Sequence, residues 1–275
     1  MGRFNGRNVV VTGASRGIGA SIAERFAAEG ANVVITARTL DQHDHLAGSL
    51  RETARRCARF GSTVVPIVAD LASGDDRARV VPESEFALGG PIDILVNNAA
   101  AGIHHSSASM SLKHRRIMFE VNFHGPIDLA QAVIPSMRAR GDGWIINLSS
   151  GGARLTPGPP FPPSVMGTTN GAYGATKAAL NRYTNVLAVE LHGTGIRINT
   201  LEPDRPVATE GAIAHLGDRI DAELYNPVEV IVEAAVALAE CGPDLTGRVC
   251  IDQPLLDELG VAVRTLDGQH ILSRP

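Results

Sequence analysis

The sequence is poor in cysteine, in excess charge and in long apolar runs. Its three cysteines, Cys57, Cys241 and Cys250, form no C-x-x-C pair and cannot all pair with one another, which fits a reducing compartment. The 25 Lys and Arg residues stand against 29 Asp and Glu residues, and the net charge of −4 gives no basic field for nucleic acid or for an anionic membrane. We therefore expect a small-molecule partner.

Signals for membrane insertion and export are missing as well. No stretch reaches the ~18 uninterrupted apolar residues of a membrane span, and the N-terminal letters MGRFNGRN contain no apolar signal core. We therefore expect a cytoplasmic protein without a membrane partner. The hydrophobic content of 44% is enough for the core of one large domain over residues 1–275.

What the sequence does contain is an alternation of short apolar runs and helical patterns. Seven runs are rich in Val and Ile: NVVVTG, ANVVITAR, STVVPIVADL, IDILVNNA, GWIINLSS, GIRINTLEP and GRVCID. Strands of this kind, separated by helices, are typical of a parallel sheet that is buried on both faces. The order predicts an α/β fold with a doubly wound parallel sheet.

The stretch TGASRGIG, residues 12–19, joins the first apolar run to the first helical pattern. Glycine costs roughly 1 kcal/mol against alanine inside a helix, so Gly13, Gly17 and Gly19 need a compensating reason. Such a turn lets the backbone approach a phosphate, with the free N–H groups of the helix start aimed at the anion. Because the spacing differs from G-x-G-x-x-G, a glycine-rich turn without a ligand stays open as the alternative.

Tyr173 and Lys177 lie four residues apart in the helical pattern AYGATKAALNRY, so they share one helix face. An ammonium beside a phenol favours the phenolate, and lowering a tyrosine pKa from ~10 to ~7 requires about 4 kcal/mol. A tyrosine tuned in this way exchanges a proton with an alcohol or carbonyl oxygen near neutral pH. The same spacing also occurs on solvated helix faces, so the pair needs support from other motifs.

Residues 154–171, RLTPGPPFPPSVMGTTNG, interrupt the alternation with five prolines and three glycines. This composition excludes regular helix and central strand and predicts a loop. Loops of this length inside a compact domain are often lids or binding segments. Because this Pro-rich insert leads directly to Tyr173, we expect it near the substrate cleft.

Taken together, six motifs resemble the short-chain dehydrogenase/reductase family: TGASRGIG, NNAA, the Asn of EVNFHG, IINLSS, YGATK and IRINTLEP. They follow in the family's order over roughly residues 7–250. The resemblance implies a single Rossmann-type domain, a homodimer or homotetramer, and hydride transfer between a nicotinamide cofactor and a ketone or secondary alcohol. The stretch ARTLDQHDHLAGSLRETARR is similar to hydroxysteroid-dehydrogenase-like members, which implies a bulky apolar substrate.

The resemblance also implies roles for single residues. Tyr173 would be the general acid/base, Lys177 would hold the nicotinamide ribose and lower the pKa of Tyr173, and Ser150 would bind the substrate oxygen. Asn122 would support a water relay to Lys177. Strand alternation lets only one of Ser149 and Ser150 face the cofactor, and the family pattern selects Ser150. The residues implied around the cofactor are Gly13, Ser15, Arg16, Gly17, Ile18, Gly19, Asp70, Leu71, Asn98, Ala99, Ala100, Tyr173, Lys177 and Pro203.

The choice of cofactor depends on the end of the second apolar run. An acid about 20 residues after the glycine turn binds the ribose 2′-hydroxyl of NAD, whereas an Arg accommodates the 2′-phosphate of NADP. Here the run ends at Arg38, no carboxylate lies in residues 31–40, and Arg16 adds a second cation. The pattern favours NADP, and Asp41 keeps NAD as the alternative.

Several departures from the family pattern limit these expectations. Ala100 replaces a usual Gly, Asp204 follows Pro203 where Gly is usual, and the 23 positions between Ser150 and Tyr173 exceed the usual gap by about ten. The end of the chain, from Cys250 onward, also differs from the family's usual C-terminal segment. A cofactor sensor without turnover, and a lyase or epimerase with the same Tyr–Lys pair, remain alternatives. We expect no metal site, although DQHDH at residues 41–45 contains plausible ligands.

Overall fold

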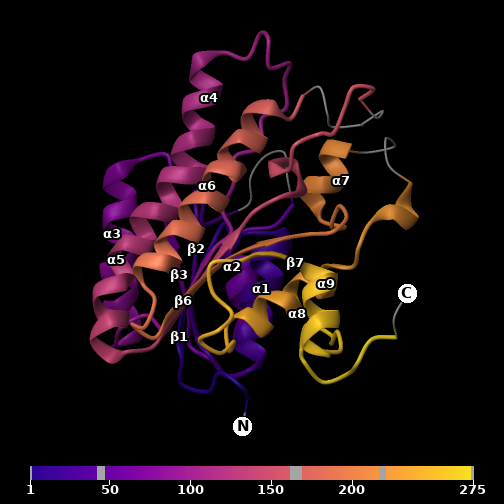
Figure 1. Cartoon of the computed structure of the whole chain (residues 1–275). Coiled ribbons are helices and arrows are strands. Elements are labelled where there is room, and N and C mark those ends of the chain that lie inside the picture. Colours follow the sequence, from indigo (N-terminus) through magenta and orange to yellow (C-terminus); the bar gives the residue numbers. More distant parts are fainter. Residues whose placement is uncertain (1, 42–46, 162–168, 217–220, 274–275) are drawn as a thin grey trace.

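The structure is a computed structural model that describes residues 2–41, 47–161, 169–216 and 221–273. Within these residues, parallel strands form one seven-stranded sheet in the order β3-β2-β1-β4-β5-β6-β7 (Figure 1). The strands are β1 (Asn8–Thr12), β2 (Asn32–Ala37), β3 (Val64–Val68), β4 (Ile94–Asn97), β5 (Gly143–Leu148), β6 (Ile196–Glu202) and β7 (Val249–Ile251). The seven apolar runs thus became the seven strands, and the predicted doubly wound sheet is confirmed.

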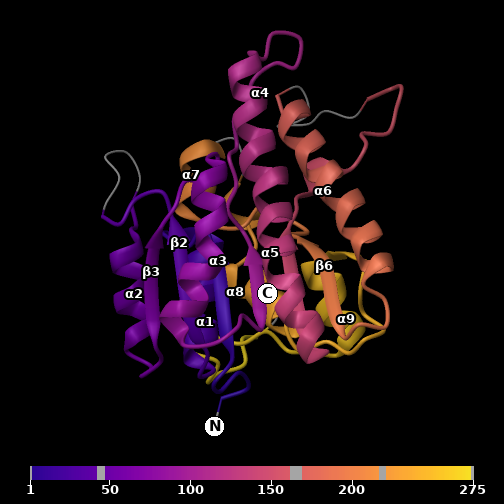
Figure 2. The same ribbon diagram turned by 90° about the vertical axis from the view of Figure 1, so that its left-hand side faces the viewer.

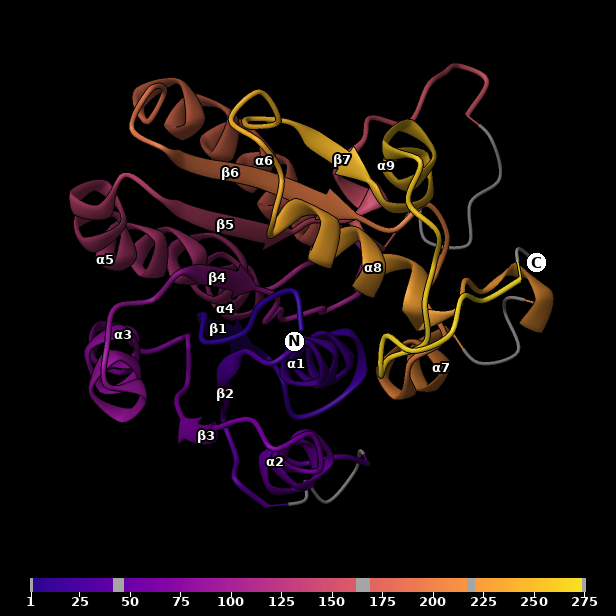
Figure 3. The same ribbon diagram turned by 90° about the horizontal axis from the view of Figure 1, so that it is seen from below.

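Helices cover both faces of the sheet, as the view from below shows (Figure 3). One face carries α1 (Gly17–Ala28), α2 (Leu50–Ala58), α8 (Val228–Leu238) and α9 (Asp252–Leu259). The opposite face carries α3 (Gly74–Leu88), α5 (Gly125–Arg140) and α6 (Gly171–Glu190). Strand β1 serves both cores, because Val9 and Val11 pack in the first cluster and Val10 packs in the second. This explains why its sequence is apolar throughout instead of alternating.

Helix α4 (Leu112–Phe119), the π-helical segment η1 (Glu120–His124) and α5 follow one another without a break (Figure 2). Pro126 has no N–H to donate to the carbonyl of Asn122, which disturbs the α-helical ladder at this point. The N–H of Gly125 instead bonds the carbonyl of Glu120, five residues earlier. The resulting π-turn holds Asn122, and such turns occur frequently at functional sites.

Short elements and the C-terminal segment complete the described chain. These are the 3₁₀ turns η2 (Gly151–Ala153) and η4 (Ala222–Leu224) and the helix α7 (Glu210–Leu216). After α9 the chain turns back, and Val261, Val263 and Leu266 pack against the core beside α1 and α8. The C-terminal segment that departs from the family pattern is therefore part of the core. Among the helices of the described residues, none combines the length and the apolarity that crossing a membrane requires.

The order of the strands fixes where a ligand site can form. Strand β1 pairs with β2 on one side and with β4 on the other, so the chain order reverses beside β1. In open parallel sheets ligands bind in the crevice outside the carboxyl ends of the strands at such a reversal. The fold therefore directs attention to the residues that follow β1, β2, β4, β5 and β6.

Candidate active site

A cavity of about 1140 Å³ lies at the carboxyl ends of the strands. Residues that follow six of the seven strands line it, and they include most residues that the family resemblance places around the cofactor. Those that line it are Gly13, Ser15, Arg16, Ile18, Gly19, Arg38, Asp70, Leu71, Asn98, Ala99, Ala100, Tyr173 and Pro203. Gly17 and Lys177 lie outside the lining. The structure thus gathers these scattered sequence motifs at one site.

The glycine turn is packed tightly against the end of β4. Gly13 has a φ of +66°, and a Cβ at this position would lie 2.6 Å from Ala99 Cα. A Cβ at Gly19 would lie 2.3 Å from Asn98 Nδ2, which donates hydrogen bonds to the carbonyls of Thr12 (2.8 Å) and Gly13 (3.2 Å). Two of the three glycines are therefore required by packing, a reason that the sequence does not display. The turn they form still opens onto the cavity.

The third glycine begins helix α1. Gly17 has a φ of +55°, and its N–H donates to Glu210 Oε2 at 3.2 Å. In the chain by itself, a carboxylate from α7 thus lies at the helix start where a phosphate was predicted. Arg16 and Arg38 both line the cavity, so the two cations that the sequence singled out for a 2′-phosphate do share one site.

Tyr173 lies in the first turn of α6, and Lys177 follows one turn later on the same face. Lys177 Nζ is 5.8 Å from the centroid of the Tyr173 ring and donates to the carbonyl of Leu148 at 2.6 Å. The side chain is only 2% exposed. Burial lowers the pKa of Lys177 to about 8, because desolvation penalises the charged ammonium.

The pKa of Tyr173 moves in the opposite direction from the prediction. Burial raises the pKa of this phenol, and the hydrogen bond with the Ser150 side chain opposes that rise. Desolvation disfavours the phenolate in the same way that it disfavours the ammonium of Lys177. In the chain by itself, Lys177 therefore does not lower the pKa of Tyr173 as expected. Ser150 is the group that shifts this pKa in the predicted direction.

Ser150, the serine that the family pattern selects, faces the cavity. It lines the cavity, and its Oγ accepts a hydrogen bond from the N–H of Gly152 at 3.1 Å. Ser149 is 6% exposed, and its buried Oγ has no hydrogen-bond partner among the described residues. Only the second serine can thus reach a molecule in the cavity.

Asn122 connects three parts of the site from behind. Its Oδ1 accepts from the N–H of Ala101 at 2.7 Å, and its Nδ2 donates to the carbonyl of Ala101 (3.0 Å) and to Thr176 Oγ1 (3.1 Å). The side chain is fully buried. These contacts reach Thr176, the neighbour of Lys177, and none of them reaches Lys177 itself. Asn122 therefore holds η1, α6 and the loop after β4 in one arrangement.

Sequence reasoning gave no catalytic or cofactor-binding role to three residues of the cavity wall. His104 lines the cavity, and its ring centroid lies 5.8 Å from that of Tyr173. Arg154 and Thr156, at the start of the Pro-rich insert, also line it, which supports the expected position of the insert. Its residues 162–168 lie outside the described chain. A positive charge four positions after Ser150 was the signal that could have pointed to Arg154.

The other reactive side chains of the described residues form no second site. The three cysteines are free and buried, and burial raises the pKa of Cys57 to about 12 and of Cys241 and Cys250 to about 11. Within the described ranges there is no group of three or more His, Cys, Asp and Glu residues that could hold a metal ion. Most of the DQHDH stretch, residues 42–45, lies outside those ranges.

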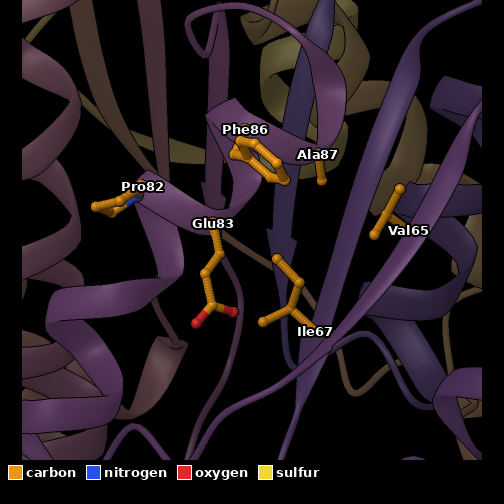
Figure 4. Close-up of a pocket in the computed structure, with 6 residues that line it drawn as sticks. All are labelled: Val65, Ile67, Pro82, Glu83, Phe86 and Ala87. Carbon is orange, nitrogen blue, oxygen red and sulfur yellow. The ribbon is translucent and has the colours of Figure 1, made fainter.

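A second hollow of about 460 Å³ lies between α3 and the edge strand β3 (Figure 4). It is lined by Val65, Ile67, Pro82, Glu83, Phe86 and Ala87. Its one charged group, Glu83, pairs with Arg79 at 3.1 Å. The hollow has no acid/base pair and no glycine turn, so the strand-end cavity is the candidate active site.

Comparison with known proteins identifies the family. The family model for short chain dehydrogenases matches residues 7–215. Hydroxysteroid dehydrogenase-like protein 2 from Homo sapiens is 31% identical over 94% of this chain, and the protein of that name from Xenopus laevis is 30% identical over the same share. The chain spans 60% of the length of each of these relatives.

Solved structures agree with this assignment. A short chain dehydrogenase from Mycobacterium thermoresistibile has a TM-score of 0.80 and 31% identity, over 94% of this chain and 88% of that one. A 3-oxoacyl (acyl-carrier-protein) reductase from Agrobacterium tumefaciens with NADP bound has a TM-score of 0.76 and 28% identity, over 90% and 93%. The family model, the relatives and the strand-end cavity agree, and the chain belongs to the short-chain dehydrogenase family.

Proposed function

We propose that this protein is an NADP(H)-dependent oxidoreductase that transfers a hydride between nicotinamide and a ketone or secondary alcohol, with Tyr173 as general acid/base. One observation carries the proposal. The side chains of Ser150 and Tyr173 interact with each other on the wall of the cavity that the glycine turn also lines. Hydride transfer to a carbonyl carbon needs hydroxyl groups that bind and protonate the carbonyl oxygen. It also needs a turn nearby that binds the phosphates of the cofactor.

The residues present fit NADP. The cavity of about 1140 Å³ exceeds the ~300–1,000 Å³ that is typical of small-ligand pockets, which suits a dinucleotide together with a substrate. Arg16 and Arg38 would hold the 2′-phosphate, and the turn at Gly13 and Gly19 would lie along the pyrophosphate. The NADP bound in the Agrobacterium tumefaciens relative supports this choice. Bound NADPH would supply the hydride.

Side chains of this protein would transfer the proton to or from the substrate oxygen. In the reducing direction, Tyr173 Oη gives its proton to the carbonyl oxygen while Ser150 Oγ donates a hydrogen bond to the same oxygen. The phenolate that remains is stabilised by the ammonium of Lys177, whose Nζ lies 5.8 Å from the ring centroid, because opposite charges interact strongly in a buried site. Asn122 acts as a positioning residue, since it holds Thr176 beside Lys177.

The test combines cofactor binding with turnover. We expect Tyr173→Phe to bind NADPH like the wild type and to lose two to three orders of magnitude in kcat, roughly the contribution of a general acid/base. NADPH oxidation across ketones, steroids and acyl thioesters measures the turnover, and NADPH fluorescence measures the binding. Full activity of Tyr173→Phe would contradict the mechanism.

The alternatives give different results in the same experiment. A wild type that binds NADPH but does not oxidise it with any of the carbonyl compounds tested would favour a cofactor sensor. Conversion of an alcohol substrate without net change in NADPH would favour a lyase or epimerase that uses the same Tyr173–Lys177 pair.

A further inference from the structure

Arg154 is held on the cavity wall by a buried acid. It follows η2, the single 3₁₀ turn after Ser150, and it is the first residue of the Pro-rich insert. Its Nε lies 2.7 Å and its Nη2 lies 2.5 Å from Oε1 of Glu202, the last residue of β6. The Glu202 side chain is 1% exposed, whereas that of Arg154 is 50% exposed and lines the cavity. A cation is thereby fixed beside the candidate catalytic residues.

The contact with Glu202 uses only one edge of the guanidinium. A guanidinium presents two pairs of N–H groups, one from Nε and Nη2 and one from Nη1 and Nη2. The contacts described for Arg154 lie on the first edge. The second edge matches the two oxygens of a carboxylate, which arginine binds with two parallel hydrogen bonds. Among the described residues, the contact with Glu202 thus leaves the second edge of Arg154 available to an anion.

A purely structural role explains this pair less well. Tying the insert to β6 is within the capacity of an exposed ion pair, which contributes little to stability. Burying the Glu202 carboxylate is costly by comparison, because its Oε2 is buried without a partner among the described residues. Fixing the half-exposed guanidinium of Arg154 at the cavity accounts for the buried carboxylate of Glu202, whereas a link between the insert and β6 does not.

We propose that the substrate carries a carboxylate that binds Arg154, so that the enzyme acts on an oxo acid or the corresponding hydroxy acid. This inference rests on the proposed function. Four residues in a 3₁₀ turn span roughly 8 Å, so Ser150 and Arg154 can reach two groups of one small molecule. Ile117 and Val121 also line the cavity. The predicted apolar character of the substrate then belongs to the part of the molecule between or beyond its carboxylate and its carbonyl group.

The test compares acids with their neutral esters. We would measure NADPH oxidation with 2-, 4- and 6-oxooctanoate and with their methyl esters, which differ only in charge and in one methyl group. For the best acid, we expect the wild-type kcat/KM to exceed that of its ester at least tenfold. Arg154→Met should remove this preference by raising KM for the acid at least tenfold. The kcat for the acid, and both kcat and KM for the ester, should stay nearly unchanged.

Three further variants sharpen the result. Arg154→Lys keeps the charge but loses the fork, so it should retain part of the preference. Glu202→Gln should raise KM for the acid and leave kcat, because Glu202 only positions Arg154. The matched control is Arg248→Met, which removes an arginine that is 44% exposed and paired with Glu258 at 2.6 Å outside the cavity. It should keep the full preference. Equal kcat/KM values of the wild type for the acid and its ester would overturn the proposal. An Arg154→Met variant that loses kcat/KM equally for the acid and for the ester would also overturn it.

A binding measurement separates this inference from the proposed function. Calorimetric titration of the protein in the presence of NADP⁺ with each oxooctanoate and its ester needs no turnover. Binding of an acid that Arg154→Met weakens at least tenfold would support the carboxylate site even if no compound were reduced, and the absence of reduction would then count against the oxidoreductase. Absence of any acid-selective binding would overturn the carboxylate site alone.

Discussion

Arg25 in α1 and Lys177 in α6 are both buried cations, at 0% and 2% exposure, but their surroundings differ. Arg25 places Nη1 2.8 Å from Glu233 Oε2 and Nε 3.1 Å from Glu29 Oε1. Lys177 donates to the backbone carbonyl of Leu148 and lies beside the Tyr173 ring. Within the described chain, no acid forms an ion pair with it.

The difference separates a structural charge from a functional one. A buried charge is tolerated when a partner compensates it, and removing that partner is strongly destabilising. Among the described residues Lys177 has no such partner, so its ammonium lowers stability and its pKa falls to about 8. Perturbed groups of this kind concentrate at catalytic sites. Substitutions around Arg25 should therefore change stability, whereas substitutions around Lys177 should change chemistry.

The largest expected effect comes from breaking the structural pair. Glu233→Ala leaves Arg25 buried without its bidentate partner and also removes the acceptor for Arg3 Nη1 and for the N–H of Arg264. We expect a loss of about 3–5 kcal/mol in the free energy of unfolding, measured by urea denaturation. Glu83→Ala, at an exposed ion pair, is the control and should cost less than about 1 kcal/mol. Equal losses in the two variants would contradict the comparison.

The next effect lies on the functional side. Ser150→Ala removes the hydroxyl that is hydrogen-bonded to Tyr173 and faces the cavity, so we expect a loss of about 100-fold in kcat, within the range for a lost hydrogen bond at a reacting oxygen, with an unchanged melting temperature. Ser149→Ala is the matched control, because its hydroxyl is buried behind the cavity wall. Steady-state kinetics with NADPH decides the point. A larger loss in Ser149→Ala would reverse the assignment of the two serines.

The smallest effect concerns the carboxylate at the start of α1. Glu210 accepts a hydrogen bond from the N–H of Gly17, where it would compete with a cofactor phosphate. A charge at a helix terminus is worth roughly 0.3–1 kcal/mol, so Glu210→Gln should tighten NADPH binding about two- to fivefold and should lower the stability of the cofactor-free protein by no more than about 1 kcal/mol. Glu223→Gln, at an exposed acid in η4, should leave the affinity unchanged. Fluorescence titration with NADPH compares the two, and weaker binding in Glu210→Gln would show that Glu210 helps to hold the cofactor.

Local patterns were enough to predict the sheet and the shared face of Tyr173 and Lys177. The inner strands β1, β2, β4, β5 and β6 are buried on both faces, so their apolar runs are visible in the sequence. Helical spacing fixes which side chains of a helix lie together. The spacing does not reveal what packs against a residue. The contact of Lys177 with Leu148, and the burial that shifts the pKa values of Lys177 and Tyr173, depend on the approach of α6 to β5.

Contacts between distant segments were also beyond sequence reasoning. Arg154 and Glu202 are 48 positions apart, and nothing in either segment indicates that they pair. Gly19 was interpreted as a phosphate-binding glycine, but its close approach to Asn98 depends on how β4 ends beside the turn. Motif order thus predicted most of the residues that gather at the strand-end cavity, whereas their electrostatic environment depends on the packed fold.

Replacement of Lys177 by Met, with stability and turnover measured on the same preparation, tests the central claim most directly. The wild type carries a lysine whose pKa falls from 10.5 to about 8 on folding, so the unfolded state binds more protons between these values and wild-type stability rises with pH across that range. At pH 7 the buried ammonium costs roughly 3 kcal/mol, and the lost hydrogen bond to Leu148 returns about 1 kcal/mol of that difference.

We therefore predict that Lys177→Met is more stable than the wild type at pH 7 by about 2 kcal/mol, that this gain disappears as the pH approaches 10, and that turnover falls at least 100-fold, as for loss of an acid/base system. A variant that is less stable at pH 7, or one that retains wild-type turnover, would show that Lys177 is a structural residue and would contradict the account.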